Sequence, residues 1–240
     1  MRRLQLAAGV VVPHAPLLLE AVAGRPVAHR VVAAAQGLAF PPADVLVVAS
    51  PHGRATGVYL GASGDLDAFG PPGVSATAAP EPGFARELAG AWGRPLLDEP
   101  VDHGVVVPLL LLDATAPVVA VAFAEGLDAE TAIAEAEGLV HALDAAGRTV
   151  VFVASANTSA GLTERSPVPS IPGAAEAEAD VLEALQSDPG DVTALLPAMA
   201  RAGSCAAGPL AAFSSLCRGR RCELLAYEAP VGVGYAVAIA

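Results

Sequence analysis

The sequence contains no lysine: all 13 basic residues are arginines, against 25 acidic residues, and the formal net charge is −12. Schiff-base catalysis and the phosphate-binding P-loop both need a lysine amine, so both are excluded. An acidic surface repels phosphate backbones, and we therefore expect no nucleic-acid binding.

Cysteine and long apolar runs are also scarce. The three cysteines, Cys205, Cys217 and Cys222, are odd in number and form no CxxC pair, which argues against a disulfide framework or a structural zinc site. The apolar run after the first residues is broken by Pro13 and His14, which favours a strand over a signal peptide. Although 54% of residues are hydrophobic, no run is long enough to predict a membrane span. We expect a cytoplasmic protein that does not enter membranes.

Apolar β-rich runs alternate with alanine-rich runs of helical period, which predicts one α/β domain over residues 1–240. Its central sheet is expected to be mixed or mostly parallel, with helices on both faces, because several strands are continuously apolar. The predicted strands are 6–12, 45–50, 57–62, 117–123, 149–155, 222–228 and 232–239. The predicted helices are 25–38, 82–92, 104–112, 128–146, 174–187, 190–201 and 206–217. Gly/Pro-rich segments at 63–83 and 161–173 are expected to be long surface loops.

Two Pro-His pairs follow buried strands. His14 comes after Val10–Pro13, and His52 comes after the run that ends at Ser50-Pro51. Ligands bind at the carboxyl ends of strands in open α/β sheets, and a preceding proline stiffens the turn that carries each imidazole. One such histidine is more simply a turn residue with ordinary hydrogen bonds. Two matching placements favour a metal site.

The other histidines differ in their surroundings. His103 follows Asp102 where a loop enters the helix predicted at 104–112, and it is a candidate catalytic residue. Asp102 either orients a neighbouring group or simply caps the helix. His29 and His141 lie within predicted helices and are expected to be solvated.

Four segments in order along the chain resemble the class III extradiol ring-cleavage dioxygenases. That superfamily includes the β subunit of protocatechuate 4,5-dioxygenase and the Memo-like proteins. The segments are VPHAP at 12–16, ASPHG at 49–53, DHG at 102–104 and, more weakly, VASANTSA at 153–160.

The resemblance implies a non-haem Fe(II) site with two histidines and one carboxylate, open to a small aromatic diol and O₂. His14 and His52 match the histidine ligands, and His103 matches the pocket histidine near the substrate. The remaining substrate-binding candidates are Asp102, Asn157 and Ser159. Family members often associate, so a homo-oligomer is compatible with the sequence.

Two positions depart from the family pattern. Ala160 stands where the family has its acid/base histidine, and Ser204-Cys205 stands where a glutamate ligand is expected. Memo-like proteins place a cysteine in that neighbourhood, so Cys205 either completes a His-His-Cys set that prefers Zn²⁺ or Cu⁺, or is a buried core residue. Glu176 and Asp180, one helical turn apart, are alternative carboxylates, although a solvated first turn explains them equally well.

The sequence therefore favours an extradiol dioxygenase-like protein whose ring-cleavage activity is lost or strongly reduced and which has a binding or regulatory role. One alternative is an active Fe(II) oxidoreductase that cleaves a catechol-type compound. Another is a Memo-like metal-binding protein that uses His14, His52 and Cys205. A third gives His103 the role of base in metal-assisted hydrolysis or redox chemistry. A metal-free protein is also compatible with the sequence.

Overall fold

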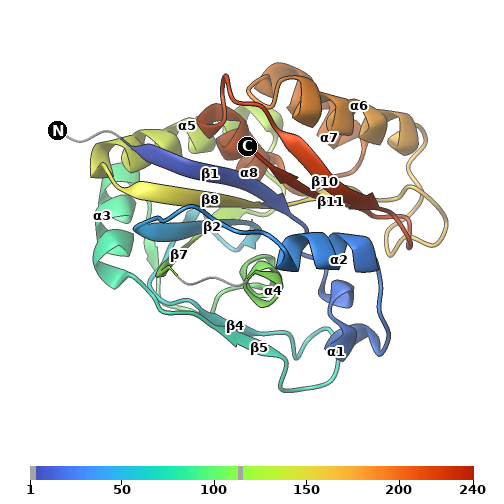
Figure 1. The fold of residues 1–240 in the computed structure, drawn as a ribbon, viewed down its shortest axis with the longest axis horizontal. Coiled ribbons are helices and arrows are strands. Elements are labelled where there is room, and N and C mark those ends of the chain that lie inside the picture. Colours follow the sequence, from blue (N-terminus) through green and yellow to red (C-terminus); the bar gives the residue numbers. More distant parts are fainter. Residues whose placement is uncertain (1–3, 113–115) are drawn as a thin grey trace.

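A computed structural model describes residues 4–112 and 116–240 and shows a single α/β domain (Figure 1). Its main sheet has nine strands, in the order β10-β11-β1-β8-β2-β7-β3-β6, with β9 paired to β11. The strands of this sheet are β1 (Gln5–Val12), β2 (Val45–Gly53), β3 (Gly57–Tyr59), β6 (Leu96–Leu97), β7 (Val118–Ala124), β8 (Thr149–Ser155), β9 (Asn157–Ser159), β10 (Glu223–Glu228) and β11 (Gly234–Ile239). A separate hairpin consists of β4 (Ser63–Asp65) and β5 (Ser75–Thr77).

The centre of the sheet is parallel. Strands β1, β8, β2 and β7 lie side by side and run in one direction, whereas β11 and β3 pair antiparallel at the two flanks of this group. All four carboxyl ends therefore meet at one edge. The expected mixed α/β architecture is confirmed.

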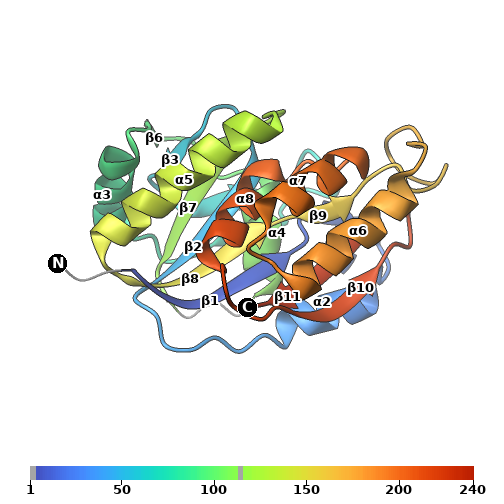
Figure 2. The same cartoon turned by 90° about the horizontal axis from the view of Figure 1, so that it is seen from above.

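Helices cover both faces of the sheet. Figure 2 shows α3 (Pro82–Trp92), α5 (Ala129–Ala146), α8 (Ala207–Leu216), α7 (Val192–Arg201) and α6 (Ala174–Ser187) along one face. The other face carries α2 (His29–Gln36) and α4 (His103–Leu111), together with the short elements η1 (Pro16–Leu18) and α1 (Glu20–Ala23). No helix in the described ranges is long and apolar enough to cross a membrane.

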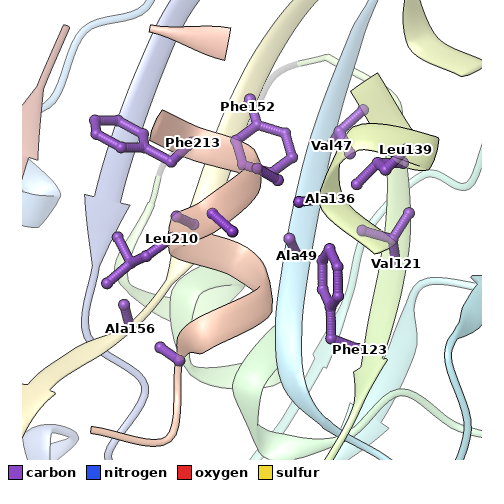
Figure 3. Close-up of a cluster of buried hydrophobic side chains, with 14 of the residues drawn as sticks. Val47, Ala49, Val121, Phe123, Ala136, Leu139, Phe152, Ala156, Leu210 and Phe213 are labelled. Atoms are coloured by element: carbon purple, nitrogen blue, oxygen red, sulfur yellow. The ribbon is translucent and has the colours of Figure 1, made fainter. Parts of the chain in front are cut away.

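The two faces explain the continuous apolar runs of the sequence. Neighbouring strand residues point to opposite sides, so Val47 and Ala49 enter the core under α5 and α8, while Leu46 and Val48 enter the core under α2 and α4. Figure 3 shows the first of these cores, where side chains of β2, β7 and β8 meet those of α5 and α8.

The predicted strands and helices are present, with bounds shifted by a few residues. Strand β2 continues to Gly53, so His52 lies in its last residues rather than beyond it. His29 begins α2 instead of lying within a helix, whereas His141 is an exposed residue of α5. The segment 63–83, expected to be a loop, contains the β4–β5 hairpin. Its strands are only three residues long and consist of small and polar residues, so they have no apolar pattern that would predict them.

Helix α2 begins without a cap from its own segment. Its N-cap residue, Ala28, is left-handed with φ 50° and supplies no side-chain hydrogen bond. Glu228, at the end of β10, accepts hydrogen bonds instead from the backbone N–H groups of Arg30 (2.9 Å) and Val31 (3.1 Å). A carboxylate distant in sequence thus caps the helix and joins it to the edge of the sheet.

We expect Glu228→Ala to destabilise the fold by about 0.5–2 kcal/mol at pH 7, the usual range for loss of a cap. Partial burial raises the pKa of Glu228, but hydrogen bonds from Val31 and Arg30 and the charge of Arg30 outweigh this effect, and the pKa is lowered. The contribution is therefore complete above the unfolded-state pKa of about 4.3 and is lost as the pH falls through the lower folded-state value.

Urea unfolding of both proteins between pH 7 and pH 3 measures this difference. The control is Glu223→Ala, which removes an exposed carboxylate from the other end of β10. A stability loss that does not shrink in acid would contradict the capping role of the Glu228 carboxylate.

Candidate functional site

The candidate site lies at the edge where the four parallel strands end. His14 follows β1, His52 lies at the end of β2, Glu125 follows β7, and Asn157 follows β8. Because the strands are parallel and adjacent, residues separated by up to 143 positions in the chain come into contact here. This is the edge at which the Pro-His pairs predicted a site.

His14 is buried and held on three sides. Its Nδ1 lies 3.1 Å from Ser155 Oγ, and its backbone N–H donates to Asn157 Oδ1 at 3.2 Å. Asn157 Nδ2 lies 3.1 Å from His14 Nε2. The Nε2 atom is thus turned toward the cluster, and Asn157, a predicted substrate-binding residue, contacts this histidine directly.

Three donor atoms form a small triangle. His14 Nε2 lies 3.1 Å from His52 Nε2, and Cys205 Sγ lies 3.4 Å from the first nitrogen and 3.7 Å from the second. The structure therefore brings together the two predicted histidine ligands and the predicted cysteine. The alternative placement of Cys205 as a buried core residue is wrong, because this residue is exposed.

Cys205 is placed by the residue before it. Ser204 Oγ donates to the backbone carbonyl of Asn157 at 2.6 Å and accepts from the backbone N–H of Ala206 at 3.3 Å, just before α8 begins. Although part of the residue is exposed, the protein atoms around its thiol reduce the hydration of the thiolate and raise the pKa of Cys205 to about 11. At neutral pH the thiol therefore keeps its proton unless a cation displaces it.

His103 begins α4 and lies beside the triangle. Its ring centroid is 4.2 Å from that of His52 and 5.8 Å from that of His14, and the nearest ligand atoms of the three histidines lie within 4.8 Å of one another. Phe69, from the loop between β4 and β5, also packs against His103, with its ring centroid 4.8 Å from that of the histidine. Phe69 is 47% exposed, and no motif around it indicated that it would lie near the site.

The three imidazoles are neutral at physiological pH. Burial lowers the pKa of His14 well below its usual value, and the nearby His52 and His103 lower it further. Burial also lowers the pKa of His52, although Asp102 and Glu125 oppose it, and lowers that of His103 to about 4. A neutral imidazole has a free lone pair, which is the form that binds metal ions.

Asp102 organises the segments that carry His52 and His103. Its Oδ1 accepts from Ser50 Oγ (2.6 Å) and from the backbone N–H of Gly104 (2.7 Å), and its Oδ2 accepts from Tyr59 OH (2.8 Å). Both interpretations of Asp102 thus apply: it caps α4 and it organises its neighbours.

Ser50 links Asp102 to the backbone of His52. Its Oγ accepts from the backbone N–H of His52 at 3.2 Å. Gly104 permits the close approach of α4 to β2, because a Cβ there would lie 2.2 Å from Ser50 Oγ. Tyr59 was missed as a site residue, since only the fold shows that it faces Asp102.

A cavity of about 440 Å³ opens beside His52. Glu125 lies at the same edge, with Oε1 3.9 Å from His52 Nδ1, and its side chain is 76% exposed. The cavity is lined by His52, Arg54, Tyr59, Glu99, Pro100 and Asp102. Its volume suits a small molecule.

Other predicted residues lie outside this cluster. Ser159, a substrate-binding candidate, is buried and donates to Glu178 instead. Asp180 forms a surface ion pair with Arg201, and Glu176 is exposed. Neither acidic residue is part of the cluster, so neither supplies the carboxylate ligand that the resemblance implies.

We expect Asp102→Ala to destabilise the protein by roughly 2–4 kcal/mol, because it removes a helix cap and leaves buried hydroxyl donors without an acceptor. Tyr59→Phe, which removes one donor, is expected to cost less. Asp98→Ala, an exposed change on the preceding loop, should stay within about 0.5 kcal/mol of the parent. Chemical denaturation measures the stability of the three variants. Equal losses of stability in Asp102→Ala and Asp98→Ala would refute the stabilising role of the Asp102 carboxylate.

Comparison with known proteins supports the fold only. No family model matches the chain, and no curated protein matches it significantly in sequence. The crystal structure of the uncharacterized protein JW3007 from Escherichia coli K12 is similar, with a TM-score of 0.61 and 18% sequence identity over 97% of this chain and 98% of that one. At this identity the two proteins share an architecture from end to end.

Proposed function

We propose that this chain is a metal-binding protein on an extradiol dioxygenase-like scaffold, in which His14, His52 and Cys205 hold one Zn²⁺ or Cu⁺ ion and ring-cleavage activity is lost or strongly reduced. The observation that carries the proposal is the triangle of donor atoms with sides of 3.1, 3.4 and 3.7 Å.

The triangle has the size that such an ion requires. Tetrahedral zinc, with bonds of about 2.0–2.1 Å to nitrogen and 2.3 Å to sulfur, separates two nitrogens by about 3.3 Å and a nitrogen from a sulfur by about 3.6 Å. A point equidistant from the three atoms of this site lies about 2 Å from each. The residues present therefore fit the ion without rearrangement of the backbone.

The donor chemistry favours a soft or borderline ion. Two neutral imidazoles and a thiolate suit Zn²⁺ and Cu⁺, whereas an Fe(II) oxygenase site uses two histidines and a carboxylate. When bound, zinc would supply a Lewis acid and copper(I) a carrier of one electron.

The chain's own residues prepare the site. Ser155 contacts Nδ1 of His14, so that Nε2 faces the triangle. When a metal ion binds, the Asn157 Nδ2 group must give up its contact with His14 Nε2. The Asn157 Oδ1 atom can still accept the hydrogen bond from the backbone N–H of His14. The Cys205 thiol, with a pKa of about 11, gives up its proton to become a ligand, so binding releases one proton.

A second candidate function is metal-assisted catalysis with His103 as the base. What favours it is the position of His103, a neutral imidazole outside the triangle and in contact with both His52 and Phe69. A small molecule bound against His103 would lie next to an imidazole able to accept its proton.

We expect the purified protein to bind one Zn²⁺ and Cys205→Ala to weaken binding by more than the roughly 10–100-fold typical of losing an outer-shell partner. Competition with a chromophoric chelator measures the affinity. With Co²⁺ as probe, the sulfur-to-cobalt charge-transfer band should be present in the parent and in Cys222→Ala, and absent in Cys205→Ala. Equal Zn²⁺ affinity of the parent and Cys205→Ala would remove the cysteine from the site.

We expect no ring cleavage. Protein reconstituted anaerobically with Fe(II) and then given catechol-type substrates and O₂ should form no yellow product, because Ala160 cannot replace an acid/base group worth about 10²–10⁴ in rate. An active class III extradiol dioxygenase assayed in parallel is the control. Clear turnover by this protein would show that another residue supplies the proton transfer and would favour the Fe(II) oxidoreductase alternative.

A further inference from the structure

Besides Asp102, a second carboxylate, that of Glu178, is held by hydroxyl groups near the site. It lies 19 residues after Ser159, the last residue of β9. Glu178, on α6, is only 3% exposed. Its Oε1 accepts from Thr158 Oγ1 (2.8 Å) and Ser159 Oγ (2.6 Å), and its Oε2 accepts from Tyr227 OH (2.5 Å). Glu178 therefore joins α6 to β9 and to β10.

Glu178 has no basic partner among the residues that the structure describes. In the described part of the chain, no ion pair connects it to an arginine or a histidine. Burial of a carboxylate without a cation costs free energy, which three hydrogen bonds from hydroxyl groups offset here. Removing the carboxylate alone would leave these three hydroxyl donors without their acceptor, so its loss is expected to disturb the strand that carries two of them.

The carboxylate imposes an unusual conformation on β9. Thr158 and Ser159 are consecutive, and side chains of consecutive strand residues normally point to opposite faces, yet both hydroxyls reach the same oxygen of Glu178. The pairing of β9 with β11 is irregular at this point, between Gly234 and Tyr235.

Gly234 makes room for this arrangement. A Cβ at Gly234 would lie 1.6 Å from Glu178 Oε1 and 2.5–2.6 Å from the hydroxyl oxygens of Thr158 and Ser159. The backbone N–H of Gly234 also donates to Ser159 Oγ at 3.0 Å. The distorted strand, the glycine and the carboxylate thus form one unit.

The first residue of this strand is the one that holds the site. The side chain of Asn157 accepts from the backbone N–H of His14. The backbone carbonyl of Asn157 accepts from the hydroxyl of Ser204, the neighbour of Cys205. Two of the three proposed ligands are therefore placed by contacts with Asn157. The position of Asn157 in turn depends on where Glu178 holds the next two residues.

We propose that Glu178 is a positioning residue of the metal site, which sets Asn157 against His14 and Ser204 by holding β9 in its distorted conformation. This inference rests on the proposed function for its metal readout. Glu178 does not touch the donor atoms itself, and it acts only through β9.

The test compares Glu178→Leu, Glu178→Gln and Glu176→Leu in the full chain, with Zn²⁺ affinity as the readout. Glu178→Leu removes both acceptor oxygens and is expected to weaken Zn²⁺ binding about tenfold or more, as loss of an outer-shell partner does. Glu178→Gln keeps an acceptor for the β9 hydroxyls and should stay close to the parent. Glu176→Leu changes an exposed glutamate on the same helix and should have no effect. Parental affinity in Glu178→Leu would overturn the proposal.

Double-mutant cycles separate positioning from general destabilisation. The effect of Glu178→Leu is expected to shrink in an Asn157→Ala background and in a Ser204→Ala background, because each removes one of the contacts through which it acts. Undiminished effects in both backgrounds would overturn the proposal. If circular dichroism shows that Glu178→Leu is unfolded, Ser159→Ala replaces it, since that change cuts the same link at β9.

A metal-free measurement distinguishes failure of this inference from failure of the metal site. In ¹⁵N-labelled protein without added metal, the side-chain amide resonances of Asn157 should shift in Glu178→Leu and stay in place in Glu176→Leu. Unchanged resonances in Glu178→Leu would overturn the positioning role even if zinc binds. If the parent protein binds no Zn²⁺ but the resonances shift, the metal site fails and the role of Glu178 in placing Asn157 stands.

Discussion

The parallel pairing of β1, β8, β2 and β7 is the constraint on which the rest of the site depends. It directs four carboxyl ends to one edge, so a short turn after each strand is enough to bring its polar residue to the others. The middle parts of these strands are apolar on both faces, and their buried hydroxyls, Ser50 and Ser155, lie near the carboxyl ends. Chemistry is thus confined to the edge, where His14 and His52 approach to 3.1 Å.

Features that depend on local sequence could be predicted, and those that depend on tertiary contacts could not. The Pro-His pairs stand at the ends of strands, and Asp128 caps α5 by accepting from the N–H of Thr131, as its place before an acidic first turn indicates. By contrast, Glu228 caps a helix that begins about 200 residues earlier, and Glu178 binds hydroxyls on three-residue strand β9. Such partners can be identified only in the folded structure. A three-residue strand is too short to show a hydrophobic period, and a single acidic residue gives no indication of its distant partner.

Two carboxylates near the site, the half-buried Asp102 and the buried Glu178, use the same chemistry. Asp102 joins β2, β3 and α4 through Ser50, Tyr59 and a backbone N–H, while Glu178 joins β9, β10 and α6 through three hydroxyls. Neither carboxylate has an arginine partner in the described ranges. Hydroxyl donors satisfy the acids without placing a positive charge close to the histidines. A nearby cation would compete electrostatically with a bound metal ion, so these neutral donors keep the edge suitable for one.

The third donor decides which ion such an edge would select. A carboxylate and a thiolate carry the same charge, so replacing a glutamate with Cys205 leaves the charge of a two-histidine site unchanged when the ligand is ionised. What differs is the cost of ionisation and the softness of the atom. A thiol with a pKa of about 11 resists losing its proton at neutral pH, and only an ion that binds sulfur strongly repays that cost. Fe(II) with O₂ chemistry gains little from this donor, whereas Zn²⁺ and Cu⁺ gain most. In the proposed dioxygenase-like site, a thiolate in place of the carboxylate selects against the ion that ring cleavage needs, which links the proposed loss of that activity to the proposed choice of metal.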